Sequence, residues 1–140
     1  MILSDHQIDV LRSSFKTIGR DPQKFADTFY SRLFAIAPET QLLFKTDMAK
    51  QGQKLMSTLG VLVARLHECE ALRPILEDLA KRHVGYGVGE EHYAVVGEAL
   101  IHALAHTLGE DHDALAAWTI TYERISSVMI EAAYCQRLAA

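Results

Sequence analysis

The histidine at position 83 has the residue type and the spacing that point most directly to chemistry. It follows Leu79 by four residues and Leu76 by seven, so a helix here places the imidazole in line with two leucines. A buried neutral imidazole needs a partner for each ring nitrogen, and a metal at one nitrogen with a carbonyl at the other satisfies both. On spacing alone, a core histidine bonded only to backbone is the commoner explanation.

Gln51 and Tyr30 are polar side chains in segments whose neighbours are mostly apolar. Gln51 lies four residues before Leu55 and shares its stripe if the segment is helical. Tyr30 follows Phe29, and a buried tyrosine hydroxyl needs a hydrogen-bond partner. Considered singly, each is better explained as an ordinary polar residue at the edge of a buried face.

His102 and His106 form a second histidine pattern, four residues apart on one helix face. This spacing suits two metal ligands. The pattern is not HExxH, because Ala103 stands where the glutamate would be, and no third ligand is evident from the sequence. A solvated helix face is therefore the better interpretation of this pair.

Motifs of nucleophilic and nucleotide chemistry are missing from the sequence. It contains no GxSxG and no Walker motif, and the glycine-rich string at 85–89 follows a predicted helix rather than a strand, so it does not suit a dinucleotide site. Cys69 and Cys135 lie far apart without CxxC spacing, and neither receives a role. These searches exclude the common hydrolase and nucleotide-binding classes.

The elements that must position these residues are all predicted to be helical. Ser4 and Gln7 have the pattern of a capping box, Asp21-Pro22 that of a cap followed by proline, and Pro74 is predicted to open a helix. Helices are expected over residues 4–18, 22–37, 48–68, 74–83, 90–108 and 113–138, with a short turn through 42–44. No segment alternates over a strand length. We predict an all-α fold of six or seven helices, packed at steep angles.

Composition narrows the classes of protein further. The 140 residues suit one domain, and 18 acidic against 14 basic residues give a net charge of −4, which offers no footprint for nucleic acid or anionic lipid. The longest apolar run, residues 59–64, is too short to span a bilayer, and the N-terminus lacks signal-peptide features. We expect a cytoplasmic protein with no membrane-spanning segment and no nucleic-acid partner.

Taken in chain order, the candidate residues form a specific series. A Phe-Tyr pair, a later phenylalanine, a glutamine and a leucine four apart, and a histidine occur as Phe29-Tyr30, Phe44, Gln51, Leu55 and His83. The strings FYSRLF at 29–34, AKRH at 80–83, HYAVVG at 92–97 and AWxxxY at 117–122 accompany them. With these residues the chain resembles, over nearly its whole length, the bacterial haemoglobins of the flavohaemoglobin type, including the single-domain Vitreoscilla-type members.

The resemblance implies a 3-on-3 globin fold with a loop in place of the fourth helix, formed by residues 1–140 as one domain that holds haem b. On the ligand side, it implies that Tyr30 and Gln51 donate hydrogen bonds to a bound gas. Leu55 would narrow the pocket, and Phe44 would wedge against the porphyrin. Donors of this kind stabilise negative charge on bound dioxygen and do much less for carbon monoxide.

On the opposite side, the resemblance makes His83 the proximal iron ligand, with a tyrosine and a glutamate beside it. Tyr93, ten residues later, matches the tyrosine. The position expected for the glutamate holds Ala133, and Glu131 lies on nearly the opposite side of the helix. We therefore expect an ordinary neutral proximal histidine rather than one with imidazolate character.

Two functions share these residues. The first is reversible dioxygen binding for storage or delivery, and the alternative is nitric oxide dioxygenation, with O2, NO and CO as the small ligands. We expect no room for the family's flavin domains, so the enzyme would draw electrons from a separate NAD(P)H-dependent flavin reductase. A haem-based gas sensor is a weaker third interpretation. The residues leave open a different tetrapyrrole or none, and coordination of ferric iron by Tyr30 or Gln51.

Overall fold

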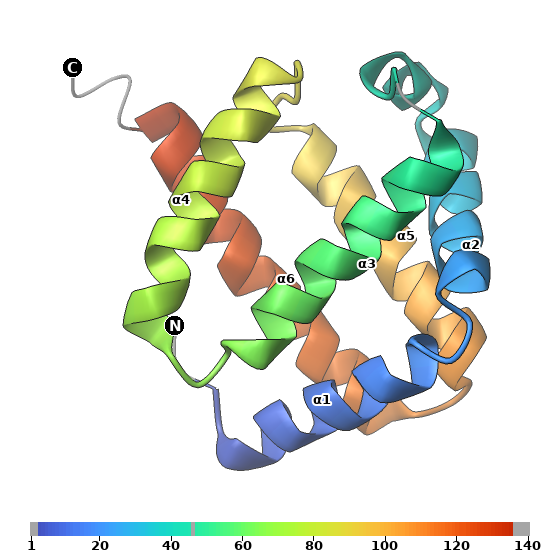
Figure 1. Cartoon of the computed structure of the whole chain (residues 1–140), viewed down its shortest axis with the longest axis vertical. Helices are drawn as coiled ribbons and strands as arrows, with labels where there is room; N and C mark the ends of the chain where they lie inside the picture. The colour runs from blue at the N-terminus through green and yellow to red at the C-terminus, as the bar shows by residue number, and fades with distance from the viewer. Residues whose placement is uncertain (1–2, 46, 136–140) are drawn as a thin grey trace.

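The computed structural model describes residues 3–45 and 47–135, with the side chains of Cys69 and Cys135 outside the description. Within these residues the structure is helical, without strands, so the all-α prediction is confirmed. The elements are α1 (Asp5–Ile18), α2 (Pro22–Ile36), the 3-10 helix η1 (Pro38–Leu43), α3 (Met48–Ala64), α4 (Cys69–Gly85), α5 (His92–Leu108), α6 (His112–Ile130) and the π-helical η2 (Glu131–Cys135). Figure 1 shows their arrangement.

The starts of α1 and α2 follow from side chains that satisfy otherwise unpaired backbone N–H groups. Ser4 accepts from the Gln7 N–H at 3.1 Å, and its own N–H donates to the Gln7 side chain at 2.8 Å, which completes a capping box. Asp21 accepts from the Lys24 N–H at 3.2 Å, with Pro22 at the first helical position. Both predicted caps are confirmed.

The start of α4 differs from the sequence-based prediction. Pro74 was expected to open this helix, but α4 begins five residues earlier, at Cys69, and runs through the proline. The missing proline N–H costs one helical hydrogen bond. Leu72 and Leu76, each only 1% exposed, lie on either side of Pro74 along the chain and continue the buried face through it. Burial of this face outweighs the local preference of proline for a helix start.

Other boundaries move by a few residues. α3 ends at Ala64, and residues 65–67 form a turn rather than a continuation of the helix. Regular α-helix in the last segment ends at Ile130, where a π-helical turn replaces it, and the expected continuation to 138 extends beyond the described residues. The described residues between η1 and α3 are not helical, as expected for a loop in place of a helix.

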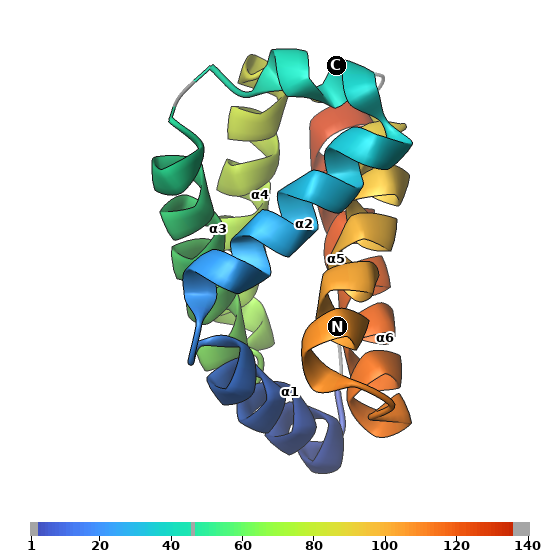
Figure 2. The ribbon, with the colours of Figure 1, turned by 90° about the vertical axis from the view of Figure 1, so that its right-hand side faces the viewer.

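The helices pack across one another in pairs. α2 packs on both α5 and α3, α1 packs on α6, and α6 also contacts α5 and α4. In the side view, α3 and α4 lie on one side of the molecule and α5 and α6 on the other, with α2 crossing between them (Figure 2). The Trp118 indole N–H donates to the buried Ser14 hydroxyl at 2.8 Å, which ties α6 to α1.

The consecutive helices α3 and α4 diverge from the turn that joins them (Figure 1). α3 packs on α1 and α2, whereas α4 packs on α6 and η2, and the two share little contact with each other. Several apolar side chains on these two helices are only partly buried: Leu55, Met56, Leu59, Leu79 and Val84. No described helix has the length and hydropathy needed to cross a bilayer.

Candidate functional site

A cluster of aromatic rings forms where α2 meets the segment after η1. Tyr30, 6% exposed, lies with its ring 5.3 Å from that of Phe44 in an edge-to-face arrangement, and Phe34 packs 5.6 Å from Phe44. Phe29 contacts Tyr30 edge-on at 4.8 Å. Such geometry is favourable for aromatic rings. It fixes the direction of the Tyr30 hydroxyl.

The hydroxyl of Tyr30 points to the first turn of α3. It donates to the backbone carbonyl of Gln51 at 3.5 Å, which is long for a hydrogen bond. Burial raises the pKa of Tyr30, and a hydrogen bond with the side chain of Gln51 opposes that shift. The group therefore stays protonated and can donate to another acceptor. The structure thus brings together Tyr30, Phe44 and Gln51.

Gly52 explains how α3 comes so near to α2, and sequence reasoning did not identify it. A Cβ at Gly52 would lie 3.0 Å from the Cβ of Ala26, closer than ordinary contact. The helices therefore cross with the glycine against the alanine, and Gln51, next in sequence, lies beside Tyr30. Leu55 follows one turn later on α3, half-buried against the core. A glycine inside a strongly periodic helix was the available signal.

His83 lies in the last turn of α4 and is half-buried. Its Nδ1 lies 2.8 Å from the carbonyl oxygen of Leu79. A carbonyl oxygen only accepts, so Nδ1 carries the proton and the lone pair is on Nε2. Burial lowers the pKa of His83, the backbone hydrogen bond raises it, and the Arg82 charge lowers it further.

Two tyrosine rings lie beside His83. Tyr93, at the start of α5, is nearly parallel to the imidazole at 6.4 Å, and Tyr86 lies at 6.2 Å. Burial, with the nearby Tyr134, raises the pKa of Tyr93 to about 12. Tyr122 donates to the Tyr93 carbonyl at 2.6 Å, and burial raises its pKa as well. The structure thus brings His83 and Tyr93 together.

The position expected for a glutamate lies at the C-terminal end of the fold. Ala133 is buried, at 5% exposure, whereas the side chain of Glu131 is exposed to solvent. The carboxylate of Glu131 therefore points away from the core that contains Tyr93.

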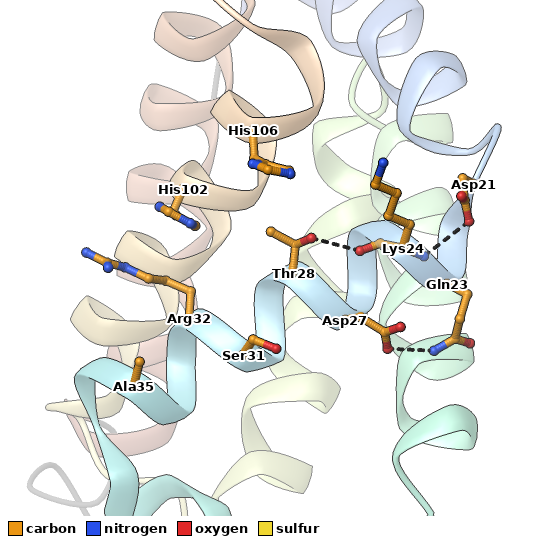
Figure 3. A pocket seen from close by; sticks show the side chains of 10 residues that line it. All are labelled: Asp21, Gln23, Lys24, Asp27, Thr28, Ser31, Arg32, Ala35, His102 and His106. Atoms are coloured by element: carbon orange, nitrogen blue, oxygen red, sulfur yellow. Dashed lines mark hydrogen bonds between the residues drawn. The ribbon is translucent and has the colours of Figure 1, made fainter.

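His102 and His106 lie elsewhere, on the face of α5 that meets α2. Both are exposed and line an open surface groove with Thr28 and Arg32 (Figure 3). Among the residues that the structure describes, no group of three or more histidine, cysteine or acidic side chains is arranged to hold a metal ion. The exposure agrees with a solvated helix face.

Six steeply packed helices, with a histidine on α4 and a tyrosine–glutamine pair where α2 meets α3, define the class of protein. The globin family model matches residues 27–129, which is most of the chain. The chain belongs to the globin family, and this membership implies haem binding. The predicted globin fold is thereby confirmed.

Similarity to curated proteins shows which kinds of globin the chain resembles. It is 28% identical over 134 residues to a flavohemoprotein of Halalkalibacterium halodurans, covering 92% of this chain and 33% of the relative. A flavohemoprotein of Bordetella parapertussis is 30% identical over 107 residues, 73% of this chain and 27% of that one. The chain thus spans a third or less of these relatives. A globin-like protein of Aquifex aeolicus is 26% identical and matches over 92% of this chain and 93% of its own.

Solved structures agree. A bacterial globin from Campylobacter jejuni superimposes with a TM-score of 0.82 at 25% identity, covering 96% of this chain and 99% of that one. An engineered carbene transferase, derived from a proposed nitric oxide dioxygenase of Rhodothermus marinus, gives a TM-score of 0.83 at 26% identity and covers 99% of this chain and 97% of its own. The similarity therefore extends over the whole fold.

Proposed function

We propose that the protein holds haem b with His83 as the axial ligand and binds dioxygen reversibly. The observation that carries the proposal is the 2.8 Å hydrogen bond between Nδ1 of His83 and the Leu79 carbonyl. It assigns the proton to Nδ1 and leaves the Nε2 lone pair for a metal, as is usual for a ligating histidine. Burial, which lowers the pKa of His83, supports the same neutral form.

The partly exposed apolar side chains of α3 and α4 support a large, flat, apolar occupant. Leu55 and Leu59 on α3, with Leu79 and Val84 on α4, are only partly buried, and the two helices share little contact with each other. Apolar lining with a few polar groups is the usual character of a cofactor site. Haem, when bound, supplies an iron atom that can take a diatomic gas. The residues present fit such a group.

On the ligand side, Tyr30 is the donor that would meet the bound gas. The bond that its hydroxyl donates, to the Gln51 carbonyl, is long at 3.5 Å, so the hydroxyl gives up little when it donates to a better acceptor instead. The raised pKa keeps the proton on the oxygen at neutral pH. A phenol donor favours the ligand with more negative charge, hence dioxygen over carbon monoxide. We assign Gln51 a second donor through its side-chain amide.

Leu55 and Phe44 would restrict water. Leu55 lies one helical turn beyond Gln51, and Phe44 packs edge-on against Tyr30. Apolar side chains on both sides of the donor pair lower the local dielectric and so strengthen its hydrogen bonds. Tyr93, nearly parallel to the imidazole at 6.4 Å, would limit rotation of the His83 ring.

Nitric oxide dioxygenation is the second candidate, and the relatives support it. The curated relatives include flavohemoproteins, and one structural neighbour derives from a proposed nitric oxide dioxygenase. The net reaction combines nitric oxide, dioxygen and one electron into nitrate. The electron would come from an NAD(P)H-dependent flavin reductase.

Rapid mixing of the dioxygen-bound protein with nitric oxide separates the two functions. For a reversible binder we expect nitrate from one turnover and no faster recovery when NADPH and a flavin reductase are added. Sustained nitrate formation that keeps pace with the added reductase would favour the enzyme. It would contradict the preference for dioxygen binding.

A further inference from the structure

Tyr134, in the π-helical turn η2, hydrogen-bonds to the loop that follows the His83 helix. Its hydroxyl donates to the carbonyl of Val88 at 2.7 Å, across 46 residues of chain. The N–H of the same Val88 donates to the carbonyl of His83 at 3.0 Å. One residue therefore connects the backbone of His83 to the phenol of Tyr134.

The loop between α4 and α5 is held by local hydrogen bonds, among them the Gly87 N–H to the Val84 carbonyl at 3.1 Å and the Gly89 N–H to Nδ1 of His92 at 2.8 Å. Gly87 adopts a positive φ of 93°, and glycines also stand at 85 and 89. The hydroxyl of Tyr134 reaches this loop from outside and holds the peptide between Gly87 and Gly89. Without that bond, the Val88 carbonyl would lose a partner and the loop would gain conformational freedom.

The π-helical turn positions the tyrosine. A π turn carries an extra residue compared with an α turn, which rotates every later side chain about the helix axis. Here it follows Ile130, packs on α4, and leaves Ala132 and Ala133 buried with Tyr134 half-buried against the loop. The one described break in α-helical regularity of the last segment thus occurs where a side chain meets the His83 segment.

We infer that Tyr134 is a positioning residue for the axial histidine. Through Val88 it fixes the backbone of His83, and it does so next to a buried alanine at the position where the resemblance leads one to expect a glutamate. The inference rests on the proposed function, because it assumes that His83 binds iron. It assigns Tyr134 an effect on the orientation of the imidazole and no contact with the haem or its ligand.

The test is the iron–histidine stretching band of the ferrous, ligand-free protein, measured by resonance Raman spectroscopy. Tyr134→Phe keeps the ring and removes the donor. We expect the band to shift or split, because the imidazole takes more than one orientation. We also expect haem transfer to an acceptor globin to be roughly fivefold faster, as for loss of one net hydrogen bond.

Two control variants separate positioning from general stability. Thr121→Val removes a buried hydroxyl on α6 that donates to the Ala117 carbonyl at the same 2.7 Å distance, an acceptor on its own helix rather than on the loop. Tyr86→Phe removes the hydroxyl of a 60% exposed tyrosine whose ring is 6.2 Å from His83. Both should leave the band unchanged, even where Thr121→Val lowers the melting temperature.

The outcomes distinguish this inference from the proposed function. If the unsubstituted protein shows an iron–histidine band and Tyr134→Phe shows the same band unchanged, the role of Tyr134 is overturned and the proposed function is not. If Tyr134→Phe is too unstable to measure, the inference is tested by the backbone hydrogen exchange of Val88 in the unsubstituted protein. Exchange as fast as that of an exposed loop would overturn the role of Tyr134. Absence of an iron–histidine band in the unsubstituted protein would overturn the proposed function and this inference together.

Discussion

Tyr30 is the residue through which ligand affinity is set in the proposed function. Its hydroxyl is buried and protonated, and the bond that it donates to the Gln51 carbonyl is long, at 3.5 Å. A hydrogen bond to a charged acceptor contributes about 1.5–3 kcal/mol, so Tyr30→Phe should speed dioxygen release by roughly tenfold or more. Stopped-flow displacement of dioxygen by carbon monoxide measures this rate. An unchanged rate, with Tyr86→Phe as control, would contradict the distal role.

Tyr122 gives a prediction about alkaline pH. Burial raises the pKa of Tyr122 in the folded protein, while a tyrosine in the unfolded chain ionises at about pH 10. The folded state holds this proton more tightly, so the contribution of Tyr122 to stability is complete below about pH 10 and is lost as the pH rises above it. In Tyr122→Phe the free energy of unfolding should fall less steeply above pH 10.

Urea unfolding at a series of alkaline pH values measures this slope. The variant should also be less stable near neutrality by about 1 kcal/mol, because the 2.6 Å bond to the Tyr93 carbonyl is lost. A slope identical to that of the unsubstituted protein would show that another group titrates in this range.

At the level of elements, a substitution at Pro74 tests whether α4 begins at Cys69 or at Pro74. If the helix runs from Cys69, the proline lies inside it and interrupts one hydrogen bond. Pro74→Ala should then raise the free energy of unfolding by about 1 kcal/mol, the helical gain being offset in part by a more flexible unfolded chain. Thermal unfolding checks this. A neutral or destabilising effect would favour a helix that begins at Pro74.

Gly52 is where α3 crosses α2, and its substitution tests how Gln51 is placed. Gly52→Ala gains helix propensity, but its Cβ would meet that of Ala26 at 3.0 Å. We expect a net loss of about 1 kcal/mol from this overpacking. Ala26→Gly in the same chain should restore most of the loss if the contact is the cause. Failure of the double variant to recover would assign the effect elsewhere.

The helices could be predicted from the sequence where the signal is local. Ser4, Gln7 and Asp21 satisfy backbone groups within three residues, so their type and spacing suffice to locate the helix starts. The start of α4 could not be found in this way, since burial of Leu72 against other helices outweighs the signal of Pro74. The π-helical turn carries no local signal, because tertiary packing on α4 selects it.

At the scale of the whole molecule, the order of Tyr30, Gln51 and His83 along the chain predicted the globin fold. The close approach of Tyr30 to Gln51 required the crossing of α2 and α3, and the stacking of Tyr93 on His83 required the turn from α4 into α5. Gly52 and Tyr134 were missed because their partners, Ala26 and Val88, are distant in sequence.

α3 and α4 diverge from the turn that joins them (Figure 1). They carry apolar side chains that are only partly buried, and the proposed haem would cover these. The central claim is that His83 holds this group from α4. Its direct test is the absorption spectrum of the reduced, carbon monoxide-treated protein, for the unsubstituted chain and for His83→Gly with and without added imidazole. We predict a strong Soret band, its loss in His83→Gly, and its recovery with imidazole. A protein without a Soret band, or a variant that keeps it unchanged, would contradict the account.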